Sequence, residues 1–470
     1  MLLPEFFLSP SFAPWLAAAN QTTEVLSQVA PDAVANPSLV LAGVLLSLVV
    51  IYFASKLGGE ICARINLPPV LGELVGGVLI GISALHLLIF PGQGIDASAS
   101  VLMQVLQGSA QLSLPELEAT FEAQSEVISV LSELGVVILL FEIGLESNLK
   151  ELIKVGIQAA IVACVGVVAP FSMGTAGLML IFHIPAIPAV FAGAALTATS
   201  IGITAKVLSE IQRLSSREGQ IIIGAAVLDD VLGIIVLAVV GGLVKTGEVQ
   251  VGNVIYLIIS AAVFLVGGIW LGRLLTPLFL SLVNRLQTRG QLLISSLIFA
   301  FALSYVAVVI QLEAILGAFV AGLILAETEK QKELEEQVIP IADMLVPVFF
   351  VVVGARTDVS VLNPFEPSNR EGLIMSLFLI AVAIVGKVVT GLTVFGQPGI
   401  NRLAIGVGMI PRGEVGLVFA AYGATTGVLS ASLQAAIIVM VILTTFLAPP
   451  LLRVVFTGEP EEATVAIAEE

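Results

Sequence analysis

Two adjacent aspartates, Asp229 and Asp230, lie near the middle of the apolar run IIIGAAVLDDVLGIIVLAVV. A charge at mid-membrane costs roughly 2.5–3.5 kcal/mol by insertion scales, so such residues are expected to have a function. Adjacent residues on a helix point about 100° apart, so one carboxylate can face a basic partner while the other faces a cavity. Two carboxylates this close disfavour double ionisation, and each can hold either a proton or a small hard cation. The pair therefore predicts a site at which two ions compete.

Three other charged residues lie inside apolar segments. Lys387 interrupts one segment, and Arg412 and Glu414 lie in the run GMIPRGEVG of another. For Lys387, a structural salt bridge and a part in the ion pathway are both open and mutually compatible. On a regular helix Arg412 and Glu414 would not face each other, but in an unwound segment they could. That pair either braces the segment or takes part directly.

Oxygen ligands for a cation are available in the run GAALTATSIGITAK, which contains Thr197, Thr199 and Ser200. This run and GMIPRGEVG are both rich in helix-weakening residues, so we expect both helices to break midway. Irregular backbone at membrane depth is tolerated only where protein or a water-filled cavity satisfies its polar groups. Hydroxyl groups or freed carbonyls could therefore complete the coordination of Na⁺ or K⁺ beside the aspartates.

The composition excludes an ordinary water-soluble domain. Of 470 residues, 58% are hydrophobic and 11% are charged, against roughly 25% charged in soluble proteins. The net charge of −16 makes nucleic acid an improbable partner, because phosphate binding needs a clustered basic face. Two isolated cysteines, Cys62 and Cys164, indicate neither a disulfide framework nor a cysteine metal site. We expect no cofactor beyond the transported ions.

The apolar runs predict an all-α polytopic membrane protein with about thirteen spans, counted against roughly 30 Å of hydrocarbon. The spans are Ser38–Cys62, Pro68–Ile89, Val127–Leu145, Leu152–Phe182, Ala186–Val207, Ile221–Val244, Val251–Val283, Leu292–Ile310, Glu313–Ala326, Ile339–Gly354, Gly372–Phe395, Gly399–Thr426 and Ser432–Phe456. Residues 1–37 form an external N-terminal segment, residues 38–456 the transmembrane domain and residues 457–470 a short cytoplasmic tail. With the N-terminus outside, most of the 19 basic residues fall in cytoplasmic loops, as expected.

An internal repeat is indicated by motifs that recur seven spans apart. LLFEIGLE around Gly144 and VFFVVVGART around Gly354 each run from an apolar stretch through a glycine to a charge. The two segments predicted to break are also seven spans apart. Because an odd offset inverts orientation, this arrangement predicts the inverted-topology repeat of many secondary transporters.

Several motifs together resemble the monovalent cation:proton antiporter-2 family. They are LPPVLGELVGGVLIG, FEIGLE, VLDDVLGI, LGAFVAGLILAE, VPVFFVVVG and GMIPRGEVGLVFA, and the similarity extends from about Leu39 to Phe456. Adjacent aspartates resemble the electrogenic sodium/proton antiporters of the family, whereas the potassium efflux members usually have Gln before a single Asp. The overall sequence resembles bacterial, and in particular cyanobacterial, members. This resemblance implies the bacterial inner membrane, or the thylakoid membrane if the source is cyanobacterial.

The resemblance also implies an architecture and a set of roles. It implies a homodimer with a dimerisation domain and a core of approximately residues 152–244 and 372–456, which moves as an elevator. Carried onto this sequence, it makes Asp230 the principal ion-binding carboxylate, Asp229 the partner of Lys387, and Thr199 a neighbouring ligand. Arg412 and Glu414 would line the crossing of the two broken helices, with Thr197 and Ser200 supporting it.

The predicted function is secondary antiport, not enzymatic catalysis: Na⁺, with Li⁺ as a surrogate, exchanges for H⁺ at Asp229 and Asp230. A K⁺/H⁺ antiporter of the same architecture is the alternative. An intramembrane aspartyl protease would need aspartates on two separate helices, and neither histidine begins the HExxH motif of a zinc protease. A passive channel would lack proton coupling.

Overall fold

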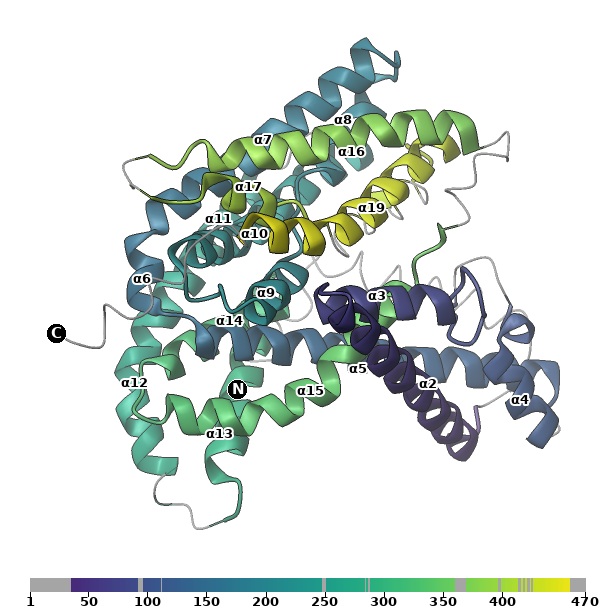
Figure 1. The fold of residues 1–470 in the computed structure, drawn as a ribbon, viewed down its shortest axis with the longest axis horizontal. Helices are drawn as coiled ribbons and strands as arrows, with labels where there is room; N and C mark the ends of the chain where they lie inside the picture. Colours follow the sequence, from purple (N-terminus) through teal and green to yellow (C-terminus); the bar gives the residue numbers. More distant parts are fainter. Residues whose placement is uncertain are drawn as a thin grey trace, which may run out of the picture. The chain divides into compact units, whose positions relative to one another are not determined.

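The structure is a computed structural model. It describes residues 35–91, 96–110, 112–246, 251–283, 285, 288–359, 369–395, 399–412, 416, 419–420, 423 and 426–456. Within these residues the chain is helical and has no strand (Figure 1), so the predicted all-α class is confirmed. The predicted tail and most of the N-terminal segment lie outside the described residues.

Among the residues that the structure describes, eight helices are long and apolar enough to cross a membrane, and shorter helices accompany them. The eight are α2 (Pro37–Arg64), α5 (Leu114–Glu146), α7 (Gly156–Leu180), α10 (Arg217–Thr246), α13 (Gln291–Val309), α15 (Gln331–Ala355), α16 (Asn369–Gly391) and α19 (Ala431–Phe456). The shorter helices include α3 (Pro69–Ile80), α4 (Val101–Ala110), α6 (Leu149–Lys154), α8 (Ala186–Ala195), α9 (Ile201–Glu210), α11 (Val251–Ala262), α12 (Gly268–Val283), α14 (Ala314–Ala326) and α17 (Arg402–Gly408). The exact count of thirteen spans stays a prediction.

By its internal contacts the chain divides into two compact units. The first comprises Met1–Val50 and His86–Ser129, and the second comprises Ile51–Leu85 and Val130–Glu470. In the first unit, the buried Gln124 amide donates a hydrogen bond of 2.9 Å to Ser47 Oγ. The helix α5 begins thirteen residues earlier than the predicted start at Val127. The reason is the glutamate half of a capping box, in which the backbone N–H and the hydroxyl of Ser113 both donate to Glu116 Oε2, over 3.0 and 2.7 Å.

Glycines bring two pairs of helices into backbone contact within the second unit. A Cβ added to Gly354 of α15 would lie 2.9 Å from the Cα of Gly77 in α3. A Cβ added to Gly322 of α14 would lie 2.8 Å from the Cα of Gly144 in α5. Small residues allow such close approach where lipid gives no hydrophobic drive for association. The glycines that mark the FEIGLE and VFFVVVGART motifs therefore serve helix packing.

The helices that surround the aspartates form a second set of contacts in the same unit. The helix α7 packs against α8, α10 and α16, and α16 packs against α17 and α19. Figure 1 shows α16 running beside α19. The predicted interruption of the segment Ala186–Val207 is confirmed, because α8 ends at Ala195 and α9 begins at Ile201. The segment Gly399–Thr426 is likewise interrupted after α17, and residues 409–412 are not helical.

We predict that Gly354→Ala destabilises the protein, because its methyl group would press on the backbone of Gly77. Overpacking of this kind costs roughly 1–3 kcal/mol, and the melting temperature in detergent should fall. Gly156→Ala in α7 is the matched control, since nothing lies within 4 Å of its added Cβ. An unchanged melting temperature for Gly354→Ala would contradict the proposed close contact.

Candidate ion-binding site

The aspartate pair lies in the interior of the second unit, on α10. Asp229 is fully buried and Asp230 is 6% exposed. Apolar residues flank them on α10, where Val227 and Val231 belong to the main hydrophobic cluster. The helix α10 packs against α7, α8, α9 and α17. Of these, α8 and α9 are the two halves of the first interrupted helix, and α17 is the first part of the second. This packing surrounds the two acids with helices.

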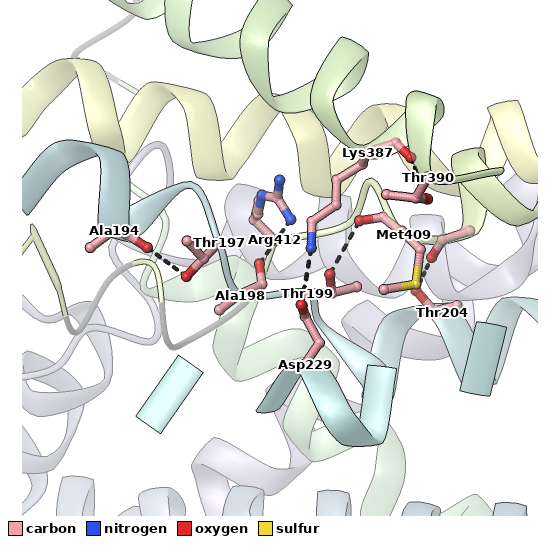
Figure 2. A network of polar contacts seen from close by, with 11 residues as sticks. Ala194, Thr197, Ala198, Thr199, Thr204, Asp229, Lys387, Thr390, Met409 and Arg412 are labelled. Carbon is pink, nitrogen blue, oxygen red and sulfur yellow. Dashed lines mark hydrogen bonds and ion pairs between the residues drawn. The ribbon is translucent and has the colours of Figure 1, made fainter. Parts of the chain in front are cut away.

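Lys387 of α16 forms an ion pair with Asp229, as the family resemblance implied. Its Nζ lies 3.1 Å from Oδ2 and 3.3 Å from Oδ1 of Asp229, and both side chains are fully buried. Figure 2 shows the ammonium reaching toward Asp229. In a low-dielectric interior an ion is tolerated only when it is paired, because desolvation is costly. The pair therefore distinguishes the two aspartates, and Asp229 is the one engaged by the lysine.

The two interrupted helices exchange hydrogen bonds where their backbones unwind (Figure 2). Thr199 Oγ1 donates to the carbonyl of Met409 over 3.3 Å. Thr204 Oγ1 donates to the carbonyl of Gly408 over 2.9 Å, and the backbone N–H of Ser200 donates to the carbonyl of Pro411 over 2.8 Å. Each interruption therefore satisfies polar backbone groups of the other, as irregular backbone at membrane depth requires.

Arg412 joins the same crossing from the second interrupted segment. It is fully buried, and its Nη1 donates to the carbonyl of Ala198 over 2.9 Å. Its own carbonyl accepts a short hydrogen bond from Thr445 Oγ1 of α19. The predicted contact with Glu414 lies outside the described residues. Arg412 and Lys387 both interact electrostatically with Asp229, and Lys387 also interacts with Asp230 and with Arg412.

The other sequence-predicted residues lie at this crossing in different settings. Thr197 Oγ1 donates to the carbonyl of Ala194 over 2.8 Å, at the end of its own helix. Ser200 Oγ is buried and has no hydrogen-bond partner among the residues that the structure describes. Carboxylate, hydroxyl and carbonyl oxygens are the donors that hard cations prefer. The crossing thus supplies oxygen donors suited to a hard cation.

Two contributing residues were not selected from the sequence as site residues. Thr204 closes the crossing toward Gly408, and Thr445 binds the Arg412 carbonyl. Thr445 belongs to a threonine pair inside the apolar run VILTTFLAPP. Such paired hydroxyls inside an apolar span are a usable signal, because membrane helices use them to bind freed backbone groups. Thr204 follows Ser200 by one helical turn, which places both on one face.

Helices interrupted at membrane depth beside buried ionisable residues are the structural hallmark of secondary transporters. Residues 43–458 match the family described as "Sodium/hydrogen exchanger, transmembrane", and the chain belongs to this family. It is therefore a secondary transporter and not an enzyme.

Individual relatives agree with this assignment. The chain is similar to the high-affinity Na⁺/H⁺ antiporter NhaS3 of Synechocystis sp., with 69% identity over 97% of each chain. It is 31% identical to the Na⁺/H⁺-K⁺ antiporter GerN of Bacillus cereus, over 88% of this chain and 97% of that protein. Its fold resembles that of the sodium proton antiporter MjNhaP1 from Methanocaldococcus jannaschii, with a TM-score of 0.58 and 16% identity over 89% and 98% of the two chains.

We predict that Lys387→Met is more destabilising than the double variant Lys387→Met/Asp229→Leu. Removing one partner of a buried pair typically costs about 3–5 kcal/mol, whereas replacing both with apolar groups is often close to neutral. Melting temperatures in detergent for both single variants and the double variant measure the coupling. Strictly additive losses would show that the two side chains do not stabilise each other.

Proposed function

We propose that this protein exchanges Na⁺, or Li⁺ in its place, for H⁺ at the aspartate pair. The observation that supports this most directly is the buried Lys387–Asp229 ion pair beside Asp230. Lys387 compensates the charge of Asp229, and we assign the exchanged ions to Asp230, the principal ion-binding carboxylate that the family resemblance implies. A proton and Na⁺ cannot both occupy it without leaving excess charge in a low-dielectric site. Competition at Asp230 then couples the two gradients, and the similarity to an Na⁺/H⁺ antiporter supports the choice of ions.

The coordination shell that we propose combines the carboxylates with the crossing. Asp230 is the principal sodium ligand, Asp229 lies next to it, and Thr199 supplies a neighbouring oxygen. The hydroxyl of Ser200 is buried at the same crossing. The crossing is supported, without binding the ion, by Thr197 and Arg412. The same role is predicted for Glu414. Unwound backbone at a helix break is a common source of ligands for coupling ions in transporters.

The proposed transport cycle moves net charge. In it, binding of Na⁺ to Asp230 is accompanied by separation of Asp229 from Lys387. When the Na⁺ leaves, Asp229 and Asp230 each take up one proton. Two protons exchanged for one sodium ion would transfer one charge per cycle. A membrane potential acts on such a step with about 2.3 kcal/mol per charge per 100 mV.

The architecture that we propose is an inverted repeat with an offset of seven spans. Spans two and ten correspond to α3 and α15, and spans three and nine to α5 and α14. A shift of seven spans relates span two to span nine and span three to span ten, so the pair α3 and α15 corresponds to the pair α14 and α5. Both pairs have glycine-mediated backbone contacts. We place the moving core at approximately residues 152–244 and 372–456, with elevator movement past a homodimeric domain.

We propose a bacterial inner-membrane location, with the N-terminus outside and the C-terminus in the cytoplasm. Exposed apolar side chains along α2 recur every four residues, at Leu41, Leu45, Val49, Phe53 and Leu57, and form a lipid-facing stripe. The similarity to a protein from the cyanobacterium Synechocystis supports the thylakoid membrane as a second address, with the N-terminus in the lumen.

Potassium/proton antiport is the second candidate. It is favoured by the similarity to GerN, an Na⁺/H⁺-K⁺ antiporter, and to the K⁺/H⁺ antiporter subunit KhtU of Bacillus subtilis, at 28% identity. A pH-sensitive dye in proteoliposomes, titrated separately with Na⁺, Li⁺ and K⁺, separates the two candidates. A response to K⁺ alone would replace the sodium assignment.

We predict that Asp230→Asn abolishes sodium-driven proton movement in proteoliposomes, because the amide cannot exchange a proton for a cation. The exposed Asp96 provides a matched control, and Asp96→Asn should exchange as the unsubstituted protein does. Melting temperatures confirm that both variants fold. Undiminished exchange by Asp230→Asn would overturn the assignment of the site.

We predict that the exchange rate depends on membrane potential. A potassium gradient with valinomycin sets the potential in proteoliposomes, and the initial rate of sodium-driven pH change is measured at several values. Reversing the sign of the potential should change acceleration into inhibition. A rate that does not respond would contradict the two-proton stoichiometry and leave ion exchange itself intact.

A further inference from the structure

The ammonium group of Lys387 is a triple hydrogen-bond donor in a fully buried position. Asp229 accepts from it at 3.1 and 3.3 Å. In the transport cycle proposed above, this ion pair has to open. An ammonium that leaves its carboxylate in a dry interior needs another acceptor, because an unpaired buried charge is strongly unfavourable. The surroundings of Lys387 on α7 provide one.

A proline interrupts the hydrogen-bond ladder of α7. Pro170 lies inside this helix and is buried. Proline has no N–H, so the carbonyl of Gly166, four residues earlier, loses its α-helical donor. Membrane helices tolerate such a proline where neighbouring helices satisfy the freed group. The carbonyl of Gly166 is thus a buried acceptor that needs a donor from outside its own ladder.

The gap in the ladder adjoins Lys387. The helix α7 packs against α16, and a Cβ added to Gly386 would lie 3.0 Å from the Pro170 nitrogen. A Cβ added to Gly166 would lie 3.2 Å from Lys387 Nζ and 3.5 Å from Thr390 Cγ2. Pro170 therefore lies beside Gly386, and the backbone of Gly166 lies beside the Lys387 ammonium.

We propose that the Gly166 carbonyl is a second docking position for the Lys387 ammonium, which occupies it when Asp229 releases the lysine. Pro170 is then a positioning residue, since it keeps this carbonyl free of a helical donor. The inference rests on the proposed exchange function. It adds to that function the place where the lysine goes when the ion pair opens.

The charges around Lys387 make a neutral acceptor valuable. Asp229, Asp230 and Arg412 are the charged groups that act on it, and α7 itself contributes none within Gly156–Leu180. Moving toward Arg412 would bring two cations together. Moving toward the Gly166 carbonyl keeps the ammonium hydrogen-bonded and leaves Asp229 able to take a proton. The exchange of acceptors involves neighbouring groups, because the Gly166 backbone lies beside the ammonium.

Pro170→Ala tests the proposal because it restores the missing N–H and occupies the Gly166 carbonyl. Loss of one charge-assisted hydrogen bond should raise the apparent KM for Na⁺ about tenfold or more, with little change in the maximal rate. If Pro170 had only a structural role, Pro170→Ala would leave the KM unchanged. Alanine restores the helical hydrogen bond, so the melting temperature should stay the same or rise. Pro340→Ala in α15, at an exposed position, is the matched control and should leave the KM unchanged.

The deciding measurement is whether the effect of Pro170→Ala requires Lys387. Sodium binding is followed as the shift of melting temperature with Na⁺ concentration, which requires no turnover. Pro170→Ala should weaken this shift in the unsubstituted background and have no further effect in the Lys387→Met background. An unchanged KM in Pro170→Ala, or an effect that persists in Lys387→Met, would overturn the inference.

A second variant keeps the test decisive if Pro170→Ala perturbs folding. Gly166→Ala places a methyl group against the ammonium and should raise the KM for Na⁺ in the same direction, whereas Gly156→Ala on the same helix should not. A Gly166→Ala variant with the original KM would also overturn the inference. Failure of the proposed function is distinguishable, because the unsubstituted protein would then show no sodium-coupled proton movement.

Discussion

The cost of placing charge in a dry interior governs this structure. Asp229 and Lys387 are both fully buried, and each is acceptable there because it faces the other. Their pairing requires α10 and α16 to remain in fixed register, and α7 to approach both closely. The small residues of α7 and α16 at this point follow from that demand, since Gly166 leaves room for the lysine and Gly386 leaves room for Pro170. The position of the ion pair thus determines where α7 and α16 can carry large side chains.

The second constraint is that no backbone polar group inside a membrane can be left unpaired. The interrupted helices solve this reciprocally, because Thr199, Ser200 and Thr204 bind carbonyls of residues 408–411. Arg412 returns a hydrogen bond to Ala198. The unwound segments are consequently held by each other and leave oxygen atoms at the level of the aspartates. The ion site that we propose uses this crossing.

Two kinds of helix contact coexist in the second unit. Glycine-mediated contacts, such as that of Gly77 with Gly354, bring backbones together and allow little sliding. Around the aspartates, the contacts are polar and involve a lysine, an arginine and several hydroxyl groups. The division suits a transporter, in which a rigid framework must support a site whose hydrogen bonds rearrange. The glycine-mediated contacts belong to the framework, and the polar contacts between α10, α16 and the interrupted helices belong to the site.

The sequence alone was sufficient for the all-α membrane class and for the two helix breaks. It also indicated buried charges at Asp229, Asp230, Lys387 and Arg412, and the structure buries all four. Hydropathy and the presence of a charged residue within an apolar segment are local features, so a short stretch of sequence reveals them. Helix ends were less well predicted, as the start of α5 shows, because the capping box at Ser113 and Glu116 lies in a polar stretch that hydropathy excludes.

The family resemblance implied that Lys387 pairs with Asp229, but physical reasoning from the residues left open which groups meet, and the tertiary structure decided it. Lys387 and Asp229 are 158 positions apart in the chain, and nothing local determines which aspartate the lysine faces. The same holds for Thr204 with Gly408, for Thr445 with Arg412, and for Gly166 with Lys387. Each residue of a helix turns the side chain by about 100°, so pairing depends on helix rotation and register. Those are determined by the packing of all the neighbouring helices together, which no single segment contains.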